Sequence, residues 1–238
     1  MYPVDLIIFD LDGTLIDSKE DLAASTNHAL HRLGLPQLSV ETIATYVGDG
    51  IYKLMERAIP SASLRAGPSA EPVVSAVEPL RAGGQAHLEL LEEAVELFRN
   101  YYSQHLLDRT HLYLGVRETL EHFQEKKKAI VSNKPYDFTM TIVEGLGIDH
   151  YFDLILGGDS TENRKPHPEP VEKVLKQLGI MKERAAIVGD SPMDIEMGRK
   201  AGLFSVAVTY GLRPREELIE TKPDLLIDDL YDLTKYLC

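Results

Sequence analysis

The sequence predicts an α/β fold, in which a Rossmann-like parallel sheet has helices on both faces and carries an inserted all-helical domain. Short apolar runs that lack polar alternation predict the sheet, because strands covered on both faces need no polar side. Helix-like segments separate most of these runs, which is typical of α/β proteins. No convincing strand occurs between about residue 17 and about residue 110, which predicts the helical insertion.

The elements of the sheet domain alternate along the chain. The expected strands are Val4–Phe9, Ala129–Ser132, Leu154–Leu156, Ala185–Val188, Val206–Val208 and Leu225–Ile227. The expected helices cover residues 115–126, 136–146, 168–178 and 191–201. Repeated alternation of this kind predicts parallel strands joined by helical crossovers. The basic run at residues 126–128 is expected to be a solvated helix end.

Helical periodicity dominates the insertion. It occurs over residues 17–33, 39–59 and about 87–107. Ser39, with Thr42 three residues later, is a plausible helix start, and Gly34 and Pro36 separate the first two segments. The predicted division is therefore a catalytic core of residues 1–16 and 111–238 and a helical domain of residues 17–110.

Residues 60–85 differ from the rest of the insertion because Ala, Pro, Gly and Ser dominate them. This composition predicts an irregular stretch within the helical domain. A flap or a partner contact is the alternative, but no residue in the stretch supports it.

Composition narrows the function classes. The formal net charge is −13, and because nucleic-acid binding needs clustered basic residues, no nucleic-acid partner is expected. The single cysteine is Cys238, the last residue, which excludes an intrachain disulfide and a cysteine metal site. No signal peptide and no membrane span are recognised, so we expect a cytoplasmic protein with no membrane partner.

Two carboxylates follow the first expected strand. In the segment "IIFDLDGTL" (7–15) the apolar run reaches Phe9 and is followed by Asp10 and Asp12, and residues two apart in an extended chain point to the same side. If the strand continues that far, both side chains converge on one point. Gly13 permits a sharp turn and Thr14 adds a hydroxyl. A strand end capped by an Asp-Gly turn is the competing interpretation.

A second acidic strand end makes a cation site the better interpretation. In the segment "AAIVGDSPMD" (185–194) an apolar strand ends in Gly189 and Asp190, with Asp194 four residues after Asp190. A helix cap at Ser191 is the simpler account of that segment. However, parallel sheets bind ligands beyond the carboxyl ends of their strands, and several carboxylates gathered there repel one another without a cation. Oxygen ligands of this kind predict Mg²⁺.

Other strand ends and loops supply neutral donors and a cation. Ser132 and Asn133 follow the second expected strand, and Lys165 lies in the proline-rich segment "NRKPHPEP". A turn and a solvated lysine are the alternatives. Together with the acidic residues, these groups suit phosphoryl transfer, which requires a nucleophile, neutralised phosphoryl oxygens and a proton donor.

Four motifs in this order resemble the haloacid dehalogenase-like (HAD) superfamily. They are D-x-D-G-T after the first strand, Ser-Asn after the next, Lys-Pro ahead of a helix, and G-D-S-x-x-D, and they span residues 10–194. One such motif is a weak signal, but four in order are strong. The resemblance implies a Mg²⁺-dependent hydrolase with a helical cap domain that closes over the substrate.

The resemblance also implies roles for individual residues. Asp10 is the implied nucleophile and a metal ligand, and Asp12 is the implied general acid and base, which gives the metal its backbone carbonyl. Lys165 neutralises the phosphoryl group and orients Asp10. Because dehalogenases of the superfamily lack the second aspartate, Asp12 implies a phosphatase. The remaining implied roles are phosphoryl binding by Gly13, Thr14, Ser132, Asn133 and the backbone amides of residues 11–14, and metal binding by Asp190 with support from Asp194.

Within the superfamily the chain looks most like the phosphoglycolate phosphatases. The segments "YVGDGIYKLMERAIP" (46–60) and "YLGVRETLEHF" (113–123) carry this likeness. It implies a small phosphorylated metabolite as substrate, with Gly48 and Gly50 letting cap backbone approach it. A glycine-containing helix start is an equally good account of the two glycines, and the longer stretch at 60–85 departs from the group.

Other functions fit the same core. A phosphosugar phosphatase or phosphomutase and a pyrophosphatase are enzymatic alternatives, and a non-catalytic phosphate-binding module is the alternative outside enzymes. That module should have lost a motif residue, yet all four of Asp10, Asp12, Lys165 and Asp190 are present. Whether the chain is a monomer or a homodimer is not decided by the sequence.

Overall fold

The computed structural model describes residues 1–60 and 80–238, with side chains for residues 1–60 and 84–238. This part of the chain forms two compact units. The core unit consists of Met1–Glu20 and Leu106–Cys238, and the helical unit consists of Asp21–His105. The helical unit is therefore inserted into the core unit close to its amino-terminal end.

The core unit contains a parallel sheet of six strands. In spatial order they are β5 (Leu154–Leu156), β4 (Lys127–Val131), β1 (Leu6–Phe9), β6 (Ala185–Gly189), β7 (Phe204–Val208) and β8 (Leu225–Ile227). The central strand β1 pairs with both β4 and β6, so that Phe9 lies opposite Ile130 and Val188. Numbered along the chain, the strands have the Rossmann order 3-2-1-4-5-6. The direction of winding reverses between β1 and β6.

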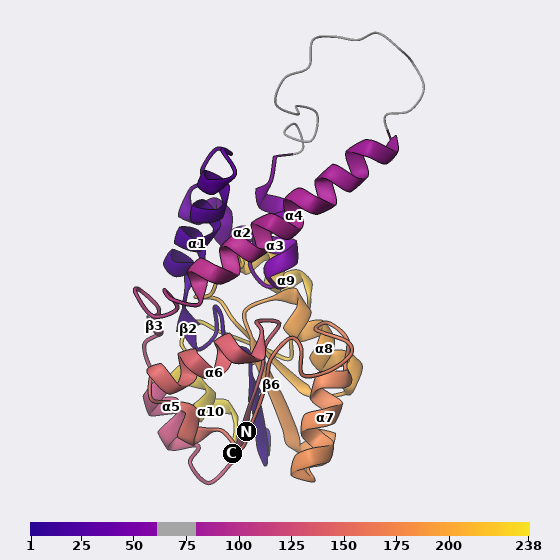
Figure 1. Cartoon of the computed structure of the whole chain (residues 1–238). Helices are drawn as coiled ribbons and strands as arrows, with labels where there is room; N and C mark the ends of the chain where they lie inside the picture. The colour runs from indigo at the N-terminus through magenta and orange to yellow at the C-terminus, as the bar shows by residue number, and fades with distance from the viewer. Residues whose placement is uncertain (61–79) are drawn as a thin grey trace, which may run out of the picture. The chain divides into compact units, whose positions relative to one another are not determined.

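Helices cover both faces of this sheet (Figure 1). On one side lie α5 (Val116–His122), α6 (Tyr136–Gly145) and α10 (Leu233–Tyr236), and on the other lie α7 (Glu169–Leu178) and α8 (Pro192–Ala201). A further helix, α9 (Arg215–Glu220), follows β7. The Rossmann-like core with helices on both faces is confirmed.

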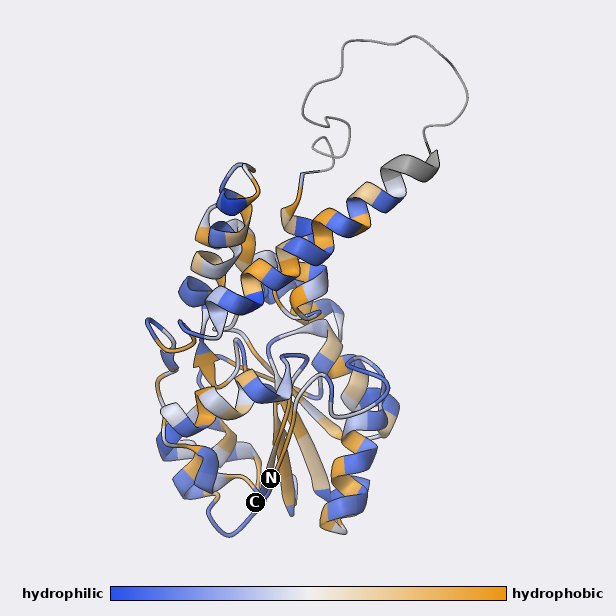
Figure 2. Cartoon of the chain, viewed as in Figure 1, coloured by the Kyte–Doolittle hydropathy of each residue, from blue (hydrophilic) through white to orange (hydrophobic). Residues whose placement is uncertain are grey.

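Burial on both faces explains why the strands read as uninterrupted apolar runs. All four residues of β1 are buried. On one face Leu6 and Ile8 join the apolar cluster that includes Val174 of α7 and Met197 of α8. The strands are accordingly among the most hydrophobic segments in Figure 2, whereas the outer helices alternate in hydropathy. This packing holds the carboxyl end of each strand in place, and so it also positions the first residues after the strand.

Two very short strands lie beside the insertion. They are β2 (Ile16–Asp17) and β3 (His111–Leu112), which pair antiparallel. The sequence does not predict them because two residues are too few for a periodic pattern. Their pairing keeps the chain within the core unit on both sides of the insertion. The structural division accordingly falls a few residues inside the expected boundaries at 16/17 and 110/111.

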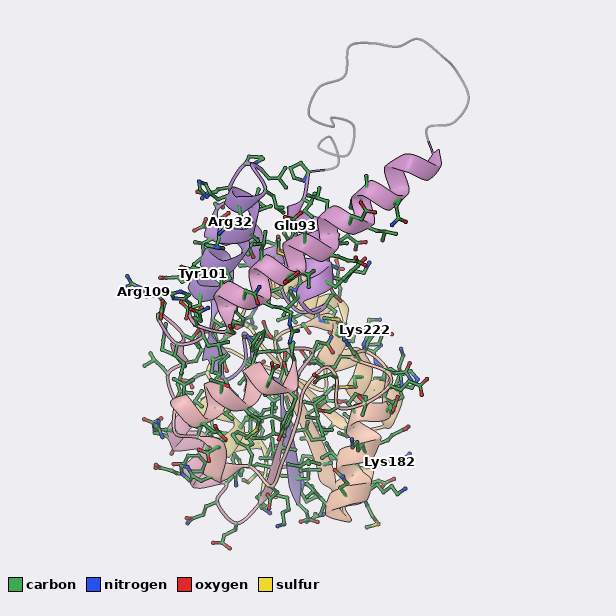
Figure 3. All side chains as sticks on the ribbon, in the orientation of Figure 1. Arg32, Glu93, Tyr101, Arg109, Lys182 and Lys222 are labelled. Carbon is green, nitrogen blue, oxygen red and sulfur yellow. The ribbon has the colours of Figure 1, made fainter. Side chains whose placement is uncertain are left out.

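The helical unit is all-helical in the described residues. Its helices are α1 (Lys19–Arg32), α2 (Val40–Tyr46), α3 (Ile51–Ala58) and α4 (Leu80–Tyr102). As expected, Ser39 begins a helix, because its hydroxyl accepts a hydrogen bond from the Thr42 N–H at 3.2 Å. The ring of Tyr101, labelled in Figure 3, stacks on His28. No described helix combines the length and the apolar character that crossing a bilayer requires.

The structure corrects the expected helix bounds in this unit. The periodic segment 39–59 is interrupted at residues 47–50, where Gly48 and Gly50 have φ values of 122° and 87° that a continuous helix does not allow. Of the stretch expected to be irregular, residues 61–79 lie outside the described residues. Residues 80–85 belong to α4, because Leu, Arg, Ala and Gln favour a helix enough to carry it past two glycines.

The lysine run at residues 126–128 is also not a solvated helix end. The strand β4 begins at Lys127, and Lys128 is buried. The Lys128 ammonium donates to the carbonyl oxygens of Phe123 at 2.7 Å and Lys126 at 2.8 Å. Burial lowers the pKa of Lys128. The run therefore stabilises the loop that leads into the sheet.

Candidate active site

The predicted polar residues lie at the carboxyl ends of three neighbouring strands. Asp10 follows β1, Ser132 and Asn133 follow β4, and Asp190 follows β6. Lys182, labelled in Figure 3, lies in the turn before β6 and marks the opposite edge of the sheet. Because the winding reverses between β1 and β6, the two aspartates flank the position where open α/β sheets bind ligands.

Lys165 joins two of the carboxylates. Its Nζ lies 2.7 Å from Oδ1 of Asp10 and 2.7 Å from Oδ1 of Asp194, and all three side chains are buried. Burial acts to lower the pKa of Lys165, but the two carboxylates outweigh burial and raise the pKa above its usual value. Lys165 is therefore a fixed cation. Oδ1 of Asp10 also accepts the Leu11 N–H at 2.6 Å.

Asp190 is held by the loops around it. Its Oδ1 accepts the Thr14 hydroxyl at 3.3 Å, and its Oδ2 accepts the Leu212 N–H at 2.7 Å. Gly211 packs so closely that a Cβ there would overlap the Asp190 side chain. Burial and the nearby Asp194 raise the pKa of Asp190 to about 7. The protein donors alone do not offset the cost of ionising this group.

Asp194 is placed by the first turn of α8. Its Oδ2 accepts the Ser191 N–H at 3.2 Å and the Ser191 hydroxyl at 2.6 Å, which completes a capping box. Its Oδ1 accepts from Lys165. Both carboxylate oxygens of Asp194 thus accept hydrogen bonds from the protein. This arrangement suits a residue that positions Lys165.

The acidic cluster has the composition of a divalent-cation site. Oxygens of Asp10, Asp190 and Asp194 all lie within 4.8 Å of one another, and the three residues are buried. Burial, followed by the charge of Asp194, raises the pKa of Asp10 well above its usual value. One positive charge on Lys165 offsets one of three negative charges. A hard cation that prefers carboxylate oxygens, such as Mg²⁺, fits this donor set.

Asp12 lies beyond the end of β1 at Phe9, so the two-residue alternation of the strand does not extend to it. Strand alternation would make Asp10 and Asp12 converge only if the strand continued to Asp12, and this condition is not met. The Oδ1 atom of Asp12 lies 2.9 Å from the Nζ of Lys134 and accepts the Ser18 hydroxyl at 2.5 Å. Asp10 and Asp12 consequently form ion pairs with different lysines, Lys165 and Lys134.

The two residues after β4 are buried at the same edge. The Oγ of Ser132 accepts the Lys134 N–H at 3.2 Å. The side-chain amide of Asn133 makes two hydrogen bonds with the backbone of Lys165: its Nδ2 donates to the carbonyl at 3.3 Å, and its Oδ1 accepts the N–H at 3.1 Å. Asn133 therefore ties the Lys165 loop to β4, a role that its sequence position does not reveal.

Gly13 permits the close approach of the first loop to Asp190. Its φ is +87°, and a Cβ there would overlap the Asp190 carboxylate. The neighbouring Thr14 donates its hydroxyl to Asp190, and its carbonyl accepts the Tyr210 hydroxyl at 2.8 Å. The Asp-Gly turn is therefore shaped by contact with the second acidic strand end.

Replacing Gly13 tests this contact. We expect Gly13→Ala to lower the free energy of unfolding by about 1–3 kcal/mol more than Gly179→Ala does. The control shares the positive φ, at +69°, but a Cβ at Gly179 meets no described atom within 4 Å. Urea denaturation of both variants measures the difference. Equal losses would mean that backbone conformation alone explains the glycine.

Gly48 and Gly50 belong to the helical unit, whereas the site residues described above belong to the core unit. Gly50 precedes the first residue of α3, and its positive φ suits a helix start. Their approach to a substrate stays a prediction.

Sequence reasoning missed several groups at this edge. Lys134, Ser18 and the Leu212 N–H each contact one of the predicted aspartates. Lys134 directly follows Ser132 and Asn133 in the chain, so its sequence position could have predicted that it lies at the same edge of the sheet. Ser18 and Leu212 lie in loops, and no pattern in the chain points to them.

Comparison with known proteins identifies the relatives of this site. Residues 7–208 match the family model described as haloacid dehalogenase-like hydrolase. The phosphoglycolate phosphatase of Salmonella typhimurium is 37% identical over 234 residues, which cover 95% of this chain and 90% of the relative. The phosphoglycolate phosphatase of Escherichia coli O157:H7 is 36% identical with the same coverage.

A solved structure is also similar. The crystal structure of a predicted phosphoglycolate phosphatase from Haemophilus somnus has a TM-score of 0.83 and 34% sequence identity to this chain. The match covers 98% of this chain and 97% of that one, so the likeness extends over both units.

Proposed function

The chain belongs to the haloacid dehalogenase-like hydrolase family, and on that premise we propose that it hydrolyses 2-phosphoglycolate to glycolate and phosphate with Mg²⁺ and an aspartyl-phosphate intermediate. The family match and the similarity to curated phosphatases identify the chain as a phosphoric monoester hydrolase. The substrate, the metal and the intermediate are our proposal. The observation that carries it is the meeting of three buried carboxylates at the switch point of the sheet, two of which pair with Lys165.

The metal would be held by the carboxylates of Asp10 and Asp190 and by the backbone carbonyl of Asp12, with Asp194 in support. When bound, Mg²⁺ supplies positive charge that neutralises phosphoryl oxygens. The raised pKa values of Asp10 and Asp190 support this assignment, because they reflect negative charge that the protein alone does not balance.

The first step transfers the phosphoryl group to the protein. A carboxylate oxygen of Asp10 attacks phosphorus, the bond from phosphorus to the ester oxygen breaks, and Asp12 gives that oxygen its proton. Lys165 neutralises the phosphoryl oxygens, and Ser132 with the Asp12 N–H donates hydrogen bonds to them. The amides of Leu11, Gly13 and Thr14, which the resemblance also implied, already donate to Asp10, Ile16 and Leu11. Since both described contacts of Asp10 involve Oδ1, we assign the attack to Oδ2.

The second step hydrolyses the aspartyl-phosphate and regenerates the nucleophile. Asp12, now ionised, takes a proton from water as the water oxygen attacks phosphorus, and the bond between Asp10 and phosphorus breaks. Phosphate leaves with Asp10 as a carboxylate and Asp12 protonated again. Dividing the reaction in this way replaces one difficult displacement by two easier ones.

The substrate assignment rests on the relatives named phosphoglycolate phosphatase at 36–37% identity over nearly the whole chain. We further propose that the helical unit is a cap domain that excludes water from the reacting groups. In that proposal Gly48 and Gly50 let cap backbone approach a small substrate.

A phosphate-release screen with Mg²⁺ tests the proposed function. The panel contains 2-phosphoglycolate, hexose phosphates, nucleotides and pyrophosphate, and we expect the highest kcat/KM with 2-phosphoglycolate. A preference for a hexose phosphate would assign a phosphosugar phosphatase, and an isomer without free phosphate would assign a mutase. A preference for pyrophosphate would assign a pyrophosphatase. No release from any ester would contradict the proposal and favour a phosphate-binding module.

A further inference from the structure

Lys134 is a second buried lysine at the catalytic edge of the sheet. Its side chain is 5% exposed, and its Nζ lies 2.9 Å from Oδ1 of Asp12, whose own side chain is 12% exposed. Burying an ammonium group is costly unless a carboxylate pairs with it closely. The close contact with Asp12 therefore offsets the cost of burying the Lys134 ammonium group.

The backbone of Lys134 is anchored on both sides. Its N–H donates to the Oγ of Ser132 at 3.2 Å, and its carbonyl accepts the Gly158 N–H at 2.7 Å. The strand β4, which lies between β5 and β1 in the sheet, ends three residues earlier. The lysine side chain thus extends from a fixed base, which limits where its ammonium can place the Asp12 carboxylate.

The contacts of Asp12 share one oxygen. Lys134 and the Ser18 hydroxyl both meet Oδ1, the latter at 2.5 Å, and neither contact involves Oδ2. Two donors on one oxygen fix the plane of the carboxylate and direct the other oxygen away from them. A group that must give a proton to one leaving oxygen needs such orientation.

We propose that Lys134 is a positioning residue that holds the carboxylate of Asp12 through Oδ1, so that Oδ2 exchanges the proton with the leaving oxygen and later with water. This inference rests on the proposed function, because it assigns Lys134 a part in the same reaction. Lys134 acts through Asp12 and is not itself assigned to contact the substrate.

The leaving group distinguishes positioning of Asp12 from a general structural role. Glycolate leaves as an alkoxide and needs a proton, whereas 4-nitrophenolate is a stable anion that needs none. In Lys134→Met we expect kcat/KM for 2-phosphoglycolate to fall about 100-fold, the size of a lost acid–base contribution. For 4-nitrophenyl phosphate the fall should stay below about tenfold. Because kcat/KM excludes hydrolysis of the intermediate, it reports only the steps up to departure of the leaving group, which include its protonation.

A double-mutant comparison tests whether Lys134 acts through Asp12. In an Asp12→Asn background, Lys134→Met should change kcat/KM for either substrate by less than about threefold, since the carboxylate that it orients is gone. Lys200→Met is the matched control, because it removes an exposed lysine that pairs with Glu196 at 2.8 Å on α8. We expect wild-type values for the control.

Equal falls for both substrates would overturn the inference, as would a further large fall in the Asp12→Asn background. A raised KM for 2-phosphoglycolate that persists without the Asp12 carboxylate would instead make Lys134 a substrate ligand, which also overturns it. Should Lys134→Met not fold, Lys134→Gln gives the same comparison with a polar side chain. A wild-type protein that hydrolyses neither ester with Mg²⁺ would contradict the proposed function itself and this inference with it.

Discussion

Asp10→Asn should abolish Mg²⁺-dependent phosphate release, with a fall in kcat of at least about 10⁴-fold, the size seen when a covalent nucleophile is removed. An amide oxygen is a poor nucleophile, and no other carboxylate of the cluster is placed to replace it. Asp190 is bound by Thr14 and Leu212, and Asp194 is bound by Lys165 and Ser191. Phosphate release under saturating substrate and Mg²⁺ measures the effect.

A matched control lies at the other end of β1. Asp5 lies just before β1 at the opposite edge of the sheet, where it pairs with Arg184 at 2.7 Å. Asp5→Asn therefore removes one carboxylate without reaching the site, and we expect wild-type turnover. Substantial activity in a folded Asp10→Asn variant would assign the nucleophile elsewhere.

Lys165→Met should affect both stability and turnover. Without metal, it leaves Asp10 and Asp194 buried and facing each other without their shared cation, and removing one partner of a buried ion pair costs about 3–5 kcal/mol. The turnover should fall by at least about 10²–10³-fold, because a fixed donor to the phosphoryl oxygens is lost. Added Mg²⁺ should recover part of the stability, since it supplies charge to the same carboxylates, but not the turnover.

Urea denaturation with and without Mg²⁺, together with phosphate release, measures both effects. Lys235→Met serves as the control, since it removes a lysine that is 64% exposed and pairs with Asp232; we expect it to match the wild type within about 0.5 kcal/mol. If Lys165→Met were as stable as the wild type without Mg²⁺, the account of Lys165 as the counter-ion of the cluster would be wrong.

The sequence predicts the core well because its strands are buried on both faces. Such strands must be apolar throughout, so runs like Ala185–Val188 are visible without any other information. The polar residues that end them are equally visible. For that reason the positions of Asp10, Ser132, Asn133 and Asp190 at one edge could be predicted from the order of strands alone.

The contacts between these residues could not be predicted in the same way. They depend on where loops pack after the strands end, as Gly211 packs on Asp190 and Asn133 holds the backbone of Lys165. Asp12 illustrates the limit: strand alternation predicted that it faces the same point as Asp10 if the strand continued that far, but the strand ends at Phe9 and the side chain pairs with Lys134.

Predictions for the helical unit were weaker for a related reason. Helical periodicity over residues 39–59 is continuous, and the backbone separates α2 from α3 by an extended Val47 and by the positive φ values of Gly48 and Gly50. A glycine in a periodic segment is compatible with either a break or a continuous helix.

Rapid acid quenching of the wild-type protein during turnover of 2-phosphoglycolate with Mg²⁺ tests the central claim most directly. The account predicts that peptide mass spectrometry finds one phosphoryl group on the peptide that contains Asp10, that the adduct is labile to base as an acyl phosphate is, and that Asp10→Asn lacks it. Phosphate release at the full rate with no phosphorylated peptide at any quench time, or a phosphoryl group on another residue, would contradict the account.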